Sequence, residues 1–229
     1  MKLFQLIYDW AELWALLIPL GVIVFRKPNN REAKWIIRYV YIGLILNGFI
    51  IAVAQFYNAM PPWLKNNNIF YNIHSVCRVI LFSLFILSVR TYKFASILKS
   101  LLVLYLIFVI INFIFFDNIF FLSSNLYAAE SIALLIICLS YFFRTILDES
   151  STHWLKHPSF LVCIGICLYE VITFFVFLFF NIISYSNDPK DRAFARIFLM
   201  IYSISFVLLC VFIAIALYKY RKKTELKIN

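Results

Sequence analysis

Residues 101–116 read LLVLYLIFVIINFIFF, sixteen positions without a single charge. A strand of a membrane barrel alternates apolar and polar residues over about ten positions, and this stretch has no such alternation. A helix of about 20 apolar residues crosses the hydrocarbon layer of a bilayer and satisfies its own backbone groups. The stretch therefore predicts a membrane-spanning helix, which we place at Ala95–Phe116.

Six more apolar runs of similar length surround this one. They are Leu3–Phe25, Trp35–Tyr57, Ile69–Val89, Leu126–Leu147, Ser159–Ile183 and Ile197–Tyr218. Of the 229 residues, 64% are hydrophobic and only 14% are charged, whereas about one quarter of a soluble domain is charged. We therefore expect an all-α, polytopic membrane protein of seven transmembrane helices, forming a single domain over residues 1–229 in the bacterial cytoplasmic (inner) membrane.

The net charge of +10 is spread over alternate loops, which indicates topology rather than nucleic-acid binding. One set of loops and the tail carry fourteen basic residues: Arg26, Lys27, Arg31, Lys34, Arg90, Lys93, Lys99, Arg144, Lys156, Lys219, Arg221, Lys222, Lys223 and Lys227. The other set carries five: Lys2, Lys65, Lys190, Arg192 and Arg196. Because cytoplasmic loops are enriched in Lys and Arg, the sequence predicts an external amino end and a cytoplasmic carboxyl end.

An internal repeat is visible in the first and fifth runs. Ala11-Glu12-x-x-Ala15-Leu16-Leu17-Ile18 matches Ala129-Glu130-x-x-Ala133-Leu134-Leu135-Ile136 at six positions, and the glutamate is the informative one. In the third and seventh runs, Ser75 matches Ser203 and His74 lies opposite Tyr202. The offset rises along the chain from 118 to 128, so insertions are needed only in loops.

Runs that begin four helices apart enter the membrane in the same direction, so the repeat predicts a parallel three-plus-one-plus-three architecture. The repeats would cover residues 1–93 and 124–221, with residues 95–116 as the linker helix. The alternative is chance similarity between apolar helices that share small residues at their packing surfaces.

Glu12, Arg78, Glu130 and Glu170 are charged residues that fall well inside the predicted spans, away from their ends. Each costs on the order of 2.5–3.5 kcal/mol at a helix centre, so all of them must face protein or water. His74 and Arg78 are four residues apart and share a helix face, which could place them against Glu12 and Glu130. Three carboxylates outnumber one arginine, so we expect a protonated carboxyl group or a bound cation.

These residues define the predicted ligand-binding or proton-carrying site. Its members are Glu12, Glu130, Arg78, His74, Glu170, Asn47 and Tyr202. The alternative is that they are interhelical contacts that fix packing and register. The five cysteines lie inside the spans and favour packing, and no motif for a metal or cofactor appears, so we expect neither.

The repeat and the buried charges favour a membrane transporter or facilitator for a small polar or cationic solute, bound between the two three-helix halves. One alternative is a ligand-sensing module that signals through a partner protein. Another is an intramembrane lipid-modifying enzyme, suggested only by carboxylates near His74. Whether the chain forms a homo-oligomer stays open.

Two resemblances bear on these alternatives. The three-plus-one-plus-three plan resembles that of the sugar transporters called SWEETs and of the nicotinamide riboside transporters, but the Pro-Gln pair and the tryptophan motif of those families are missing, so no ligand residues are carried over. The segment His157-Pro158-Ser159-Phe160, with Tyr169, Phe174-Phe175 and Asn181, resembles uncharacterised seven-helix membrane proteins of Bacteroidota. That resemblance implies a signalling partner such as a sensor kinase.

Overall fold

The chain folds into long α-helices, in a computed structural model that describes residues 10–61, 65–89, 95–147, 157–184 and 189–225. The helices are α2 (Ala11–Arg26), α3 (Arg31–Gln55), α4 (Asn68–Val89), α5 (Ala95–Ile111), α6 (Ser124–Leu147), α7 (Pro158–Ser184) and α8 (Pro189–Glu225). A 3-10 turn at Tyr57–Ala59 follows α3, and a π-helical turn at Asn112–Phe116 extends α5. The predicted all-helical fold is confirmed for these residues.

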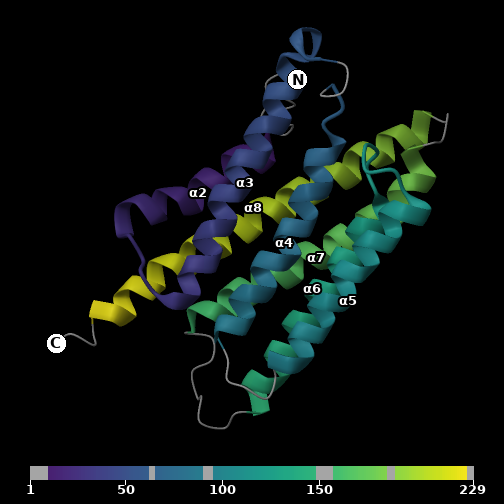
Figure 1. Ribbon diagram of the computed structural model, residues 1–229. Coiled ribbons are helices and arrows are strands. Elements are labelled where there is room, and N and C mark those ends of the chain that lie inside the picture. The colour runs from purple at the N-terminus through teal and green to yellow at the C-terminus, as the bar shows by residue number, and fades with distance from the viewer. Residues whose placement is uncertain (1–9, 62–64, 90–94, 148–156, 185–188, 226–229) are drawn as a thin grey trace.

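Six of these helices are long and apolar enough to cross a membrane, as an integral membrane protein requires. The described part of α2 has 16 residues, and the start of the predicted span Leu3–Phe25 lies outside the described residues. Helix α8 has 37 residues, a length of about 55 Å, and Figure 1 shows it running along the whole bundle from green to yellow.

Local sequence explains where the helices begin and end. Lys27 adopts a left-handed conformation (φ 45°) and its N–H binds the Ile23 carbonyl, which ends α2 immediately before Pro28. Ser123 caps α6, because its hydroxyl oxygen accepts the Leu126 N–H at 3.0 Å. These ends fix the short connections that make neighbouring helices antiparallel.

The helices form a ring in the order α2, α3, α4, α6, α7 and α8, and α8 closes the ring by packing against α2. Helix α5 lies outside the ring, where it packs against α4 and α6 (Figure 1). Many of its apolar side chains are exposed, including Leu104, Ile107 and Ile110. Such a surface suits contact with acyl chains. The ring order is compatible with the predicted repeat, which stays a prediction.

Polar contacts hold together the end of the bundle where α2 and α8 finish and α3 and α7 begin. Arg26 donates to the Tyr218 hydroxyl at 3.0 Å, and Asn30 donates to the Tyr220 carbonyl at 3.2 Å. Ser159 donates to Glu32 at 3.0 Å. We call this the basic end, because Arg26, Lys27, Arg31 and Lys34 lie there. Its predicted cytoplasmic location stays a prediction.

The opposite end is held by asparagines at the start of α4. Asn72 donates to the carbonyls of Ile119 and Phe121 at 2.9 and 2.8 Å, which fastens α4 to the connection between α5 and α6.

Of the basic residues from which the orientation is predicted, five lie outside the described residues: Lys2, Arg90, Lys93, Lys156 and Lys227.

The interface between α7 and α8 depends on Gly165. A Cβ atom at this position would lie 2.8 Å from the Cβ atom of Phe212, too close for the two helices to keep their separation. We therefore expect Gly165→Ala to lower the free energy of unfolding by about 1–3 kcal/mol through overpacking. Gly48→Ala is the matched control, because nothing lies within 4 Å of its added Cβ. Thermal unfolding in detergent measures both, and equal stability of the two variants would contradict the prediction.

Candidate functional site

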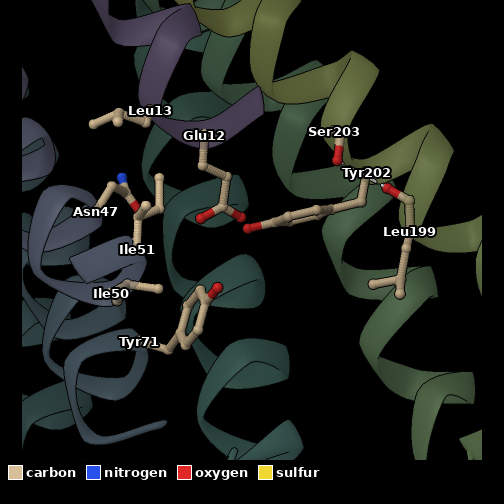
Figure 2. A pocket seen from close by; sticks show the side chains of 9 residues that line it. All are labelled: Glu12, Leu13, Asn47, Ile50, Ile51, Tyr71, Leu199, Tyr202 and Ser203. Carbon is tan, nitrogen blue, oxygen red and sulfur yellow. Dashed lines mark hydrogen bonds between the residues drawn. The ribbon is translucent and has the colours of Figure 1, made fainter. Parts of the chain in front are cut away.

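A cavity of about 320 Å³ opens among α2, α3, α4 and α8, between the middle of the bundle and the end opposite the basic end. It is lined by Glu12, Leu13, Asn47, Ile50, Ile51, Tyr71, Leu199, Tyr202 and Ser203 (Figure 2). Leu199 at its rim is exposed, and Glu12 is half-buried. The cavity therefore combines one carboxylate, polar side chains and apolar walls.

The polar groups of the cavity face one another from different helices. Figure 2 shows the Glu12 carboxylate of α2 and the Tyr202 hydroxyl of α8 directed at each other. The ring of Tyr71 lies beneath them in the same view, and the amide of Asn47 lies on the side of α3. None of the residues that line the cavity is basic, so among the described residues of its wall the carboxylate has no cationic partner.

A buried ion pair lies deeper in the bundle, between α4 and α6. Arg78 Nε is 2.9 Å from Glu130 Oε1, and both side chains are almost completely buried. The Ser75 hydroxyl donates to Glu130 Oε2 at 2.6 Å. Both carboxylate oxygens thus have a partner, which is what an ion pair needs to persist away from water.

Hydroxyl groups connect this ion pair to the cavity. Arg78 Nη1 donates to the Tyr169 hydroxyl, and Tyr169 donates to the Tyr202 hydroxyl at 2.8 Å. Tyr202 accepts that bond, so its own proton is left for the Glu12 carboxylate toward which it points. The chain from Glu130 through Arg78, Tyr169 and Tyr202 to the cavity joins α4, α6, α7 and α8.

Glu170 of α7 makes no described hydrogen bond to this network, and its side chain is fully buried. Ser131 of α6 donates to Oε2 at 2.9 Å. Its other oxygen, Oε1, has no hydrogen-bond partner among the described residues. Glu170 therefore belongs to the buried polar core but not to the lining of the cavity.

Asn47 and His74 are buried as well. Asn47 lines the cavity, and its amide nitrogen has no hydrogen-bond partner in the described part of the chain. The His74 ring lies parallel to that of Tyr39, with 6.3 Å between the ring centroids, and its Nε2 has no partner there either. His74 does not line the cavity and takes no part in the ion pair of Arg78 and Glu130.

Five of the seven residues predicted from sequence divide into two groups, and His74 and Glu170 belong to neither. Glu12, Asn47 and Tyr202 line the cavity, whereas Arg78 and Glu130 form the ion pair beside it. Sequence reasoning expected one cationic strip against both repeat glutamates. In the structure Arg78 contacts Glu130 and reaches toward Glu12 only through the hydroxyls of Tyr169 and Tyr202.

Several polar residues of the site were not predicted from sequence. They are Tyr71, Ser75, Ser131, Tyr169 and Ser203. Ser131 and Tyr169 each stand next to a buried glutamate in the sequence, and Ser75 and Ser203 are matched by the predicted repeat. These two features of the sequence could have identified the four residues as members of the site.

Tyr169 offers a test of the hydroxyl chain. Tyr169→Phe keeps the ring but removes the acceptor for Arg78 and the donor for Tyr202. Because hydrogen bonds to charged groups contribute about 1.5–3 kcal/mol, we expect the free energy of unfolding to fall by about that amount. Tyr39→Phe is the control, since the buried Tyr39 hydroxyl has no partner among the described residues. If the two variants unfold at the same temperature in detergent, the hydrogen bonds of the Tyr169 hydroxyl contribute nothing to the stability of the protein.

Comparison of the chain with known protein families, curated proteins and solved structures gives no match. The predicted resemblances to transporter families and to seven-helix proteins of Bacteroidota therefore stay predictions. What can be inferred about function comes from the cavity and the polar network themselves.

Proposed function

We propose that this chain is a membrane transporter or facilitator for a small organic cation, which binds in the cavity beside Glu12. The observation that carries this proposal is a carboxylate facing an open cavity whose described wall contains no basic residue. A negative charge placed in low-dielectric surroundings attracts a positive ligand strongly. The ion pair of Arg78 and Glu130 nearby is already neutral as a unit.

The rest of the wall fits an alkylammonium ion. Tyr71 and Tyr202 offer aromatic rings, which attract ammonium groups through their negative faces. Leu13, Ile50 and Ile51 offer apolar surface for alkyl groups. A volume of about 320 Å³ lies at the lower end of the range for small-molecule sites. We therefore favour a compact cation over a sugar or an anion.

The position of the cavity supports transport. Its walls come from α2, α3 and α4 of the first predicted repeat and from α8 of the second, so a relative movement of the two halves would change its access. At the basic end, the contacts of Arg26 with Tyr218 and of Glu32 with Ser159 hold the helices together. Under the predicted orientation, the cavity is accessible from outside and closed toward the cytoplasm.

The predicted repeat gains support from the two glutamates. Glu130 of α6 accepts a hydrogen bond from Ser75 of α4, at 2.6 Å. Glu12 of α2 shares the cavity with Ser203 of α8. The repeat pairs Glu12 with Glu130 and Ser75 with Ser203, so each glutamate lies near the serine of the other predicted half.

A second candidate function is ligand sensing through a partner protein. It is favoured by the dense packing of the ring, in which Phe82, Phe85 and Phe206 are almost completely buried. The chain from Tyr202 through Tyr169 to Arg78 could transmit occupancy of the cavity to the interface between α4 and α6 without any passage of solute.

Uptake by proteoliposomes tests the proposal and separates the two functions. With the purified chain reconstituted, we expect uptake of labelled tetramethylammonium that unlabelled choline inhibits and that glycerol and acetate do not. Saturable binding without uptake would favour sensing. Neither binding nor uptake of any small organic cation would contradict both forms of the proposal.

A further inference from the structure

Glu170 is a buried acid that the proposed cation site does not use. Its side chain is fully buried, and it makes one hydrogen bond, accepted from Ser131 at 2.9 Å. Glu130 makes an instructive comparison, since it is equally buried but has both Arg78 and Ser75 as partners. The two acids therefore differ in what balances their charge.

Arg78 already has partners other than Glu170. Its Nε pairs with Glu130 and its Nη1 donates to Tyr169, so the ion pair of Arg78 and Glu130 is complete without Glu170. An unpaired charge buried away from water costs several kcal/mol, whereas an unpaired neutral hydroxyl costs about 1–3 kcal/mol. For Glu170 the cheaper arrangement is the neutral acid.

We propose that Glu170 is a proton-binding site, which holds a proton on Oε1 while Oε2 accepts the hydrogen bond from Ser131. In this state the carboxyl group is neutral and the Ser131 contact is kept. The charged and titratable groups around it are Arg78 of α4, Tyr105 of α5, Glu130 and Cys138 of α6, and Tyr169 and Cys167 of α7 itself.

This site gives the proposed transport a coupling ion, and this part of the inference rests on the proposed function. Glu170 follows Tyr169, which links Arg78 to Tyr202 at the cavity. A cation in the cavity and a proton on Glu170 are both positive, so each weakens the binding of the other through the low-dielectric interior. Entry of the cation then breaks the O–H bond of Glu170, the electron pair stays on the carboxylate, and the proton passes to water. The expected coupling is exchange of one monovalent cation for one proton.

Infrared difference spectroscopy of the purified full-length protein tests the proton site directly. We expect a C=O stretching band of a neutral carboxylic acid that is absent from Glu170→Gln. The glutamine keeps an oxygen that can accept from Ser131, so this variant preserves the described hydrogen bond. Glu32→Gln, a glutamate change at the basic end, is the control and should leave the band unchanged.

A second variant guards against misfolding of the first. Ser131→Ala removes the only described hydrogen bond to Glu170 but keeps the acid, so the C=O band should persist and move to higher frequency. A wild-type spectrum without such a band, or a band that neither variant alters, would overturn the proton site.

Proton release tests the coupling separately. Addition of tetramethylammonium chloride to weakly buffered protein should release at most about one proton per chain, detected with an indicator dye. Glu170→Gln should bind tetramethylammonium and release none. Release that survives in this variant would assign the proton to another group and overturn the coupling. A carboxylic acid band without tetramethylammonium binding would refute the proposed function and leave the proton site standing; binding without the band would do the reverse.

Discussion

Arg78→Met is expected to lower the free energy of unfolding by about 3–5 kcal/mol, more than Gly165→Ala or Tyr169→Phe. The methionine leaves Glu130 without its cationic partner in a fully buried position. It also removes the donor to the Tyr169 hydroxyl. Denaturation in detergent, followed by circular dichroism, measures the loss.

Two controls separate the charge from the side-chain volume. Arg38→Met is the matched control, because Arg38 is exposed and lies over the Trp35 ring at 4.4 Å; we expect a loss of about 0.5–1 kcal/mol. The double variant Arg78→Met with Glu130→Gln should recover much of the stability, since it removes the unpaired acid as well. A loss below about 1 kcal/mol for Arg78→Met would show that the ion pair is not a structural element.

Glu12→Gln is expected to have the largest effect on ligand binding. It removes the one charged side chain among the described residues of the cavity wall and leaves the shape of the cavity almost unchanged. Loss of one partner of a desolvated charge pair costs about 2–5 kcal/mol, and the half-buried position of Glu12 points to the lower limit. We therefore expect a loss of affinity for tetramethylammonium of roughly thirtyfold.

Stability and binding must be measured together for this variant. Glu12 does not take part in the ion pair of Arg78 and Glu130, so we expect Glu12→Gln to unfold at a temperature close to that of the wild type. Glu32→Gln makes the same chemical change at the basic end and should bind tetramethylammonium normally. Equal weakening by both glutamate changes would indicate a general effect of charge rather than a site at Glu12.

The helices could be predicted from sequence because hydrocarbon demands long apolar runs. The predicted run Ile69–Val89 corresponds to α4 at Asn68–Val89, and Leu126–Leu147 corresponds to α6 at Ser124–Leu147. Helix α8 differs, since it begins at Pro189 and not near Ile197. Its first residues include charges, which hydropathy places outside a span although the backbone continues as a helix.

The sequence predicts which charged residues are buried better than it predicts the contacts between them. Charges inside apolar runs had to avoid lipid, and Arg78, Glu130 and Glu170 are indeed buried. Their partners depend on how each helix is rotated about its axis, which apolar runs with weak amphipathicity do not fix. For this reason Tyr169 and Ser131 were not predicted. Tyr169 links Arg78 to the cavity, and Ser131, a neutral residue, donates the described hydrogen bond to Glu170.

The most direct test of the cation site is equilibrium binding of labelled tetramethylammonium to the purified chain in detergent. We predict saturable binding to the wild type, competition by choline but not by acetate, and weakening in Glu12→Gln with Glu32→Gln unchanged. Absence of saturable binding to the wild type, or equal affinity in Glu12→Gln, would contradict the assignment of the cavity as a cation site.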